Sequence, residues 1–91
     1  MATVTVNCPR DVYTQVTTLT DAYCIVSSPL DSKRQGQDIR IHIGLAAPAS
    51  TTKAFHPLNP DEGYERPLEL SGHIFIMPVS RDEDIPVTEA V

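Results

Sequence analysis

Apolar and polar residues alternate in several short segments of this chain, and a period of two is typical of β-strands. The clearest segment is 38–44, where every second residue is an isoleucine: Ile39, Ile41 and Ile43. These side chains share one face of a strand, and the polar residues between them lie on the other face. We expect a strand here whose isoleucine face covers the hydrophobic core.

Three more segments are predicted to be strands in the first third of the chain. Residues 3–6 alternate threonine with valine, and residues 12–19 are rich in β-branched and hydroxyl side chains. Residues 22–26 are apolar on both faces, which is typical of a strand covered on both sides. We therefore expect the segment 22–26 to be a central strand.

One run near the C-terminus also carries apolar side chains on both faces. Ile74 and Ile76 point one way, and Phe75 and Met77 point the other. A domain this small has room to bury one such face in its core. The second face either meets another subunit or lies under the chain's own excursion at residues 45–55, and the pattern leaves both possibilities open.

Loops rich in proline, glycine and polar residues separate these segments. Residues 30–37 are polar and predict a surface loop, and residues 59–63 contain the proline and glycine of a tight turn. Residues 45–61 form a long excursion rich in Ala, Pro, Ser and Thr. We expect Phe55 and Leu58 to anchor this excursion.

The last predicted strand, residues 85–88, contains a proline. Pro86 has no N–H group to donate to a neighbouring strand. We therefore expect an edge strand, or a strand in which this position points away from its neighbour. The acidic residues 82–84 that precede it are predicted to form a turn that faces solvent.

Together these segments predict an all-β fold: a small antiparallel β-sandwich or barrel of about six to eight short strands. No window of the chain shows the apolar period of a helix free of proline and glycine. The 91 residues fit a single β domain, 1–91. Because a domain of this size leaves much of its surface in water, we expect copies to associate as a homo-oligomer.

Composition narrows the classes of partner. The chain has 7 Lys and Arg against 12 Asp and Glu, a formal charge of −5, and no basic stripe that would follow a phosphate backbone. We therefore expect no nucleic-acid ligand. No apolar run approaches the roughly 18 residues of a membrane span, and residues 1–6 lack the pattern of a signal peptide. We expect no membrane association, and synthesis in a cytosol-like compartment.

Candidate chemistry is sparse. Cys8 and Cys24 form no CxxC motif and, in a reducing compartment, are predicted to be free and buried. His42 and His73 would approach each other, with Asp38 near, if their strands pair, but no metal-binding motif accompanies them. No nucleophile motif or glycine-rich phosphate loop occurs. We expect no enzyme activity, no metal site and no cofactor.

The order of segments over residues 38–90 points beyond the fold class. A strand at 38–44 is followed by a link rich in Ala, Pro and Ser, a turn at 58–64, a run at 72–76 and a terminal segment at 87–90. This order resembles that of small β-sandwich virion proteins of tailed bacteriophages. Such modules often carry an aromatic residue, commonly tryptophan, in the penultimate strand, where this chain has Ile74 and Phe75 and no tryptophan. The resemblance implies a module that coats or decorates the virus particle, located in the virion after synthesis in the host cytoplasm.

The resemblance implies a capsid decoration or cement protein that stabilises the head shell by multivalent binding to the major capsid protein or other virion proteins. The candidate contact residues are Phe75, Met77, Phe55 and Leu58. Two other functions fit the same sequence: a tail or fibre adaptor module, and a small acidic protein that binds and inhibits a partner enzyme. Presence in purified particles would separate the inhibitor from the two virion proteins.

Overall fold

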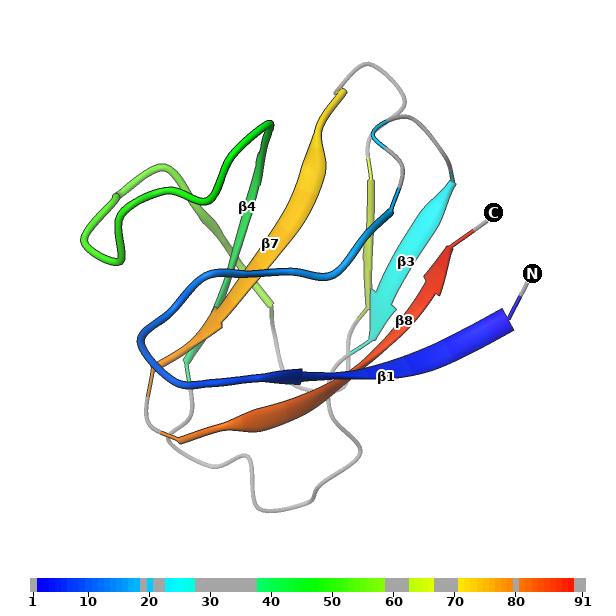
Figure 1. The fold of residues 1–91 in the computed structure, drawn as a ribbon, viewed down its shortest axis with the longest axis horizontal. Helices are drawn as coiled ribbons and strands as arrows, with labels where there is room; N and C mark the ends of the chain where they lie inside the picture. The colour runs from blue at the N-terminus through cyan, green and yellow to red at the C-terminus, as the bar shows by residue number, and fades with distance from the viewer. Residues whose placement is uncertain are drawn as a thin grey trace.

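Two antiparallel β-sheets pack face to face in the computed structural model of the chain (Figure 1). The structure describes residues 2–18, 20, 23–27, 38–58, 63–66, 71–79 and 81–89, and these residues contain eight strands and no helix. The predicted all-β sandwich is therefore confirmed. The predicted loop at 30–37 and residues 59–62 of the turn predicted at 59–63 lie outside the described residues.

Each sheet has four strands. In the first, which we call sheet A, the strand order is β1-β8-β3-β6, with β1 at Ala2–Cys8, β8 at Glu83–Glu89, β3 at Cys24–Ser27 and β6 at Gly63–Glu65. In the second, sheet B, the order is β2-β7-β4-β5, with β2 at Thr14–Gln15, β7 at His73–Pro78, β4 at Ile39–Gly44 and β5 at His56–Pro57.

The main core fills the space between the two sheets. Alternate positions of β4 and β7 supply isoleucines from sheet B, as the period of two requires. Its buried members are Ile39, Ile41, Ile74 and Ile76 of sheet B, Cys8, Cys24, Val26, Ile85 and Val87 of sheet A, and Val16 and Leu58 beside the strands. The prediction for the segment 38–44 is confirmed, since Ile43 also packs against this core, partly buried.

The chain around β2 runs along the edge of β7. Asp11 N donates to Pro78 O at 2.8 Å before the strand, and Val16 N donates to Ile74 O at 2.9 Å after it. Ile74 N then donates to Thr17 Oγ1 at 3.1 Å, so a side chain takes the place of a backbone acceptor. For this reason the β-rich segment 12–19 contributes a strand of two residues rather than a long one.

A second, smaller core covers the other face of β7. Phe75 and Met77 are each 3% exposed and cluster with Tyr13, while Val79 packs against them. Thr14 pairs with Ile76, so Tyr13 lies one position further along, beside Met77. The cover on this face therefore comes from the same chain: from Tyr13, and from the His42 ring, whose centroid lies 6.1 Å from that of Tyr13 and 6.4 Å from that of Phe75.

Two predictions about strand position have different outcomes. β3 lies between β8 and β6, which confirms a central strand; it begins at Cys24, and residue 22 lies outside the described residues. Its second face is covered only in part, since Ile25 is half-buried. β8 also lies inside its sheet, between β1 and β3, so the first alternative for 85–88, an edge strand, is wrong. The second alternative, a proline position without a neighbour on one side, fits the register. The ladder to β3 ends at Val87, and Pro86 faces only Thr5 of β1. A proline is tolerated there because strand pairing on one side has already ended.

The two ends of β8 carry buried glutamates on the core face. Glu83 and Glu89 alternate in step with Ile85 and Val87 and are buried like them. The Glu89 carboxylate accepts from Thr18 N at 2.9 and 3.0 Å and from Thr18 Oγ1 at 2.6 Å. The segment after β2 is thereby tied to sheet A at one end of the core.

Candidate interaction site

The clearest projection from the sandwich is the segment 45–55, which we call the arm. The arm joins β4 to the edge of sheet B at β5, and Figure 1 shows it in green, extending away from both sheets. It presents two large apolar side chains, Leu45 at 80% exposed and Phe55 at 36%. Exposed apolar groups of this size are typical of contact surfaces when they occur together.

The arm is tied to sheet B at its base. The ring Nδ1 of His42 on β4 lies 2.7 Å from Ala54 O, and β5 pairs with β4. Within the arm, Thr52 N donates to Ala49 O at 3.0 Å. Leu58, directly after β5, is buried in the main core. These contacts hold the arm in a defined position, and a segment that is ordered in advance loses less entropy on binding a partner.

Phe55 lies under a cation. The Arg40 guanidinium is 4.5 Å from the centroid of the Phe55 ring, close enough for a cation–π interaction. No Asp or Glu occurs from residue 39 to residue 58, whereas the whole chain has a formal charge of −5. The arm and β4 therefore combine apolar area with the cations Arg40 and Lys53 in an otherwise acidic protein.

The four predicted contact residues lie in three different environments. Leu58 anchors the arm in the core, as predicted, whereas Phe55, which was expected to anchor it as well, is exposed on the arm. The prediction of Phe75 and Met77 as contact residues is corrected, because both are buried within the chain. They cluster with Tyr13, so the cover that was expected from the excursion at 45–55 comes from another segment. Of the four, Phe55 is the residue with substantial exposed area.

The sequence did not identify Leu45 or the pairing of Arg40 with Phe55. Leu45 continues the alternation of the isoleucines in β4, but the strand ends at Gly44 and leaves its side chain in solvent. Arg40 and Phe55 are far apart in the sequence, so no local pattern links them. The alternation did place Arg40 correctly on the outer face of its strand.

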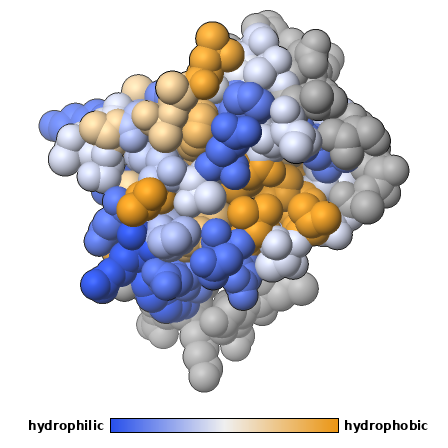
Figure 2. Space-filling view, in the orientation of Figure 1, coloured by the Kyte–Doolittle hydropathy of each residue, from blue (hydrophilic) through white to orange (hydrophobic). Residues whose placement is uncertain are grey.

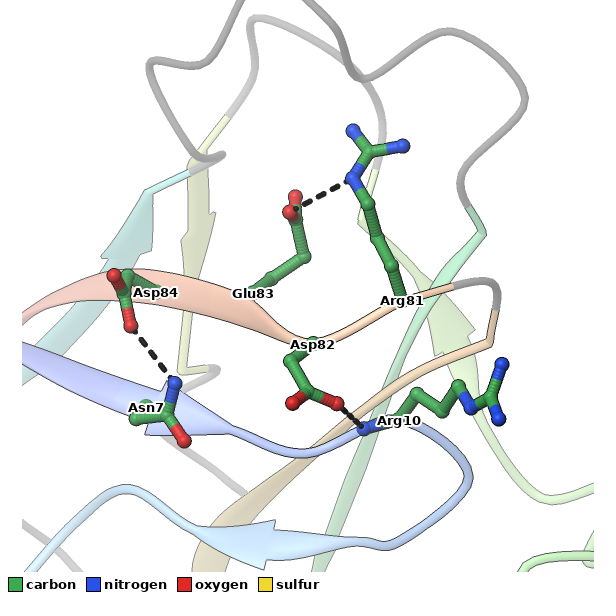
Figure 3. Close-up of polar contacts among 6 residues, drawn as sticks. All are labelled: Asn7, Arg10, Arg81, Asp82, Glu83 and Asp84. Atoms are coloured by element: carbon green, nitrogen blue, oxygen red, sulfur yellow. Dashed lines mark hydrogen bonds and ion pairs between the residues drawn. The ribbon is translucent and has the colours of Figure 1, made fainter.

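The acidic turn faces solvent only in part (Figure 3). Asp82 is exposed, and its Oδ1 accepts from Arg10 N at 2.9 Å. Asp84 is also exposed and accepts from Asn7 Nδ2 at 3.0 Å.

Glu83, between these two aspartates, corrects the prediction that residues 82–84 all face solvent. Its side chain turns inward, and its Oε1 lies 3.3 Å from Arg81 Nε. Its Oε2 is buried with no hydrogen-bond partner among the described residues. Because Glu83 is the first residue of β8, the period of two directs its side chain to the core.

The two cysteines are free and fully buried. Cys8 pairs with Glu83 and Cys24 with Glu89, at opposite ends of β8 and about 20 Å apart at strand spacing, too far for a disulfide. Burial raises the pKa of Cys8 to about 12, with a smaller contribution from the Asp84 charge. Burial also raises the pKa of Cys24, against the opposing effect of Arg66. Neither thiol has the lowered pKa of a catalytic nucleophile.

The strands that carry His42 and His73 do pair, since β4 and β7 are neighbours. Each ring has a contact of its own: His42 with Ala54 O, and His73 Nδ1 with Thr17 Oγ1 at 3.2 Å. Within the described ranges, no group of three or more His, Cys, Asp or Glu side chains is placed to hold a metal ion.

No protein family, curated protein or solved structure matches this chain. In the part of the chain that the structure describes, no helix is long and apolar enough to cross a bilayer.

Proposed function

We propose that this chain is a decoration protein of a tailed-phage head, which binds the major capsid protein through the arm and stabilises the shell at many repeated sites. The proposal rests on the resemblance of residues 38–90 to small phage virion proteins, and the β-sandwich fold is compatible with it. The observation that carries the contact is the arm, with Phe55 and Leu45 exposed on a base that is tied to β4.

The body of the sandwich is a poorer contact surface than the arm. Both faces of β7 are buried within the chain, so Phe75 and Met77 have little area to offer. On the arm, the Phe55 ring is in contact with Arg40, and the residue is still 36% exposed. An aromatic ring that is positioned before binding is a common anchor of protein interfaces.

Repetition would make a modest contact sufficient. A single arm buries a small area, and truncating one aromatic anchor typically costs about 1–3 kcal/mol of binding. A shell presents the same site many times, so copies that are linked to one another would gain avidity. The function therefore does not require a large interface on each copy.

The acidic inhibitor is supported less well by the surface. Asp82 and Asp84 are the exposed acids of the turn, and each already accepts an intramolecular hydrogen bond. A tail or fibre adaptor would use the same fold and differ in its location on the particle. The deciding experiment must therefore show whether the protein is present in the particle and whether it lies on the head or on the tail.

The first test is to quantify the chain in purified particles and in separated heads and tails of the source phage. The proposal predicts copy numbers comparable to those of the major shell protein, confined to heads. Enrichment in tails would instead identify an adaptor. Absence from particles would contradict both virion functions.

The second test adds purified protein back to heads that lack it. Phe55→Ala should weaken binding about 10- to 100-fold, since the ring is the exposed anchor of the arm. Tyr23→Ala is the matched control, because Tyr23 is also an exposed aromatic residue but lies outside the arm, next to β3. Equal losses for the two variants would contradict a contact through the arm.

A further inference from the structure

β1 is an edge strand of unusual length for this molecule. It has seven residues, whereas the other edge strands have two in β2, two in β5 and three in β6. Among the described residues, its only strand neighbour is β8. The other edge of β1 therefore presents backbone N–H and C=O groups on which another strand can pair.

β1 also lacks the features by which proteins usually block such pairing. Its sequence, ATVTVNC, contains no charged residue and no proline, whereas β5 contains Pro57 and β6 contains Glu65. Val4 is 56% exposed. It pairs with the buried Val87 of β8, so its side chain lies on the face of β1 that is directed to the core. Figure 2 shows a hydrophobic patch near the centre of this view, beside the path of β1 in Figure 1.

We propose that β1 pairs antiparallel with β1 of a second copy of this chain, so that the sheets A of the two copies join into one continuous sheet. A two-fold axis at Thr5 lets the whole strand, Ala2–Cys8, overlap with its counterpart. In this register Thr5 faces Thr5 of the second copy, and Val4 faces Val6. The contact is self-complementary, as a two-fold interface requires.

Charge and shape favour a second copy as the occupant. The chain has a formal charge of −5, so copies repel each other wherever acids meet, but β1 brings no charge to the contact. The second β1 is already extended by pairing with its own β8, so little ordering is needed on association. Pairs of β-branched side chains across neighbouring strands add to the backbone hydrogen bonds.

The test is the association state of the purified chain, measured by sedimentation equilibrium from micromolar to millimolar concentration. The wild type should dimerise. Thr5→Lys and Thr5→Glu should each weaken the dimer at least about tenfold, because like charges then face each other across the axis. Thr5 is exposed and lies outside the core, so both variants should keep the far-ultraviolet circular dichroism spectrum of the wild type.

Mixing the two variants provides the sharpest result. A Lys and a Glu that face each other at the axis should restore a dimer that contains one copy of each. Thr51→Lys, an exposed threonine of the arm, is the control and should dimerise like the wild type.

A wild type that stays monomeric throughout would overturn the inference, as would a dimer that either Thr5 variant leaves intact. Folded variants that stay monomeric when mixed would overturn the two-fold contact at Thr5. No particle is needed for these measurements, so their outcome is independent of the proposed role on a phage head.

Discussion

The outer faces of the two sheets differ although both follow the same alternation. On sheet A the outer face of β1 is polar: Thr3 and Thr88 lie 2.6 Å apart through their hydroxyl oxygens, and Asn7 donates to Asp84. On sheet B the corresponding face of β7 is apolar and is buried under Tyr13. The comparison shows that a strand with two apolar faces needs cover on both, and that a short segment of the same chain can supply the second cover.

This difference changes where a partner can bind. An apolar run such as residues 73–77 suggests an interface when it is considered alone, because a small domain has one main core. Tyr13 removes that possibility by closing the face within the chain. Among the described residues, the surfaces that we propose for contacts are the arm, with Phe55, and the edge of β1.

The largest expected effect is on the outer face of sheet B. Phe75→Ala should lower the free energy of unfolding by about 3–5 kcal/mol, because the ring is buried and its loss leaves a cavity. Thr88→Ala, on the outer face of sheet A, should cost less than about 1.5 kcal/mol, since it removes one hydroxyl hydrogen bond. Urea unfolding of both variants measures the difference, and equal losses would erase the contrast between the two faces.

A smaller effect is expected where sheet A closes the core. Glu89→Gln should cost about 1.5–3 kcal/mol, because Thr18 N and Oγ1 both donate to the carboxylate and an amide retains only one acceptor oxygen. Glu65→Gln, an exposed position on β6 of the same sheet, should change stability by less than about 0.5 kcal/mol. If the two substitutions have the same effect in thermal unfolding, the Glu89 contact does not stabilise the fold.

The smallest of these effects depends on pH and concerns Cys8, which pairs with Glu83 at the opposite end of β8 from Glu89. The pKa of Cys8 is raised from 9.0 to about 12 in the fold, so the unfolded chain loses its proton first as the pH rises. Stability from this group is complete below pH 9 and is lost as the pH approaches 12. Between pH 8 and pH 10 the loss should be about 1.4 kcal/mol.

Cys8→Ala is the control for that pH dependence. The variant should lack this part of the alkaline decline, while any decline caused by the raised pKa values of Tyr13, Tyr64 and Cys24 should persist. Parallel stability curves for wild type and variant would show that the Cys8 thiol ionises equally in the folded and unfolded states.

The alternation of apolar and polar residues predicted most of the fold. It located β4 and both faces of β7, because residues with a period of two leave few choices of orientation. The same alternation places Glu83 and Glu89 on the buried face of β8, in step with Ile85 and Val87. That signal was missed because acidic side chains are usually exposed, and a partner such as Thr18 is visible only in three dimensions.

The cover over β7 lay beyond sequence reasoning. Tyr13 sits in a segment without a clear period, and its position depends on hydrogen bonds from Asp11 and Val16 to β7. The same holds for the candidate site: Phe55 was identified as an anchor of the excursion, but its contact with Arg40 depends on how the arm folds back. The position of Tyr13 and the contact of Phe55 with Arg40 both depend on contacts between residues that are far apart in the sequence.

The most direct test of the internal cover is an isotope-filtered nuclear Overhauser measurement on the Met77 methyl group. The chain has two methionines, so methyl labelling gives a simple spectrum. In a mixture of labelled and unlabelled protein, we expect cross-peaks from the Met77 methyl group to the Tyr13 ring within one chain, and none between chains. Cross-peaks to Tyr13 that arise only between chains, or none to Tyr13 at all, would contradict the account.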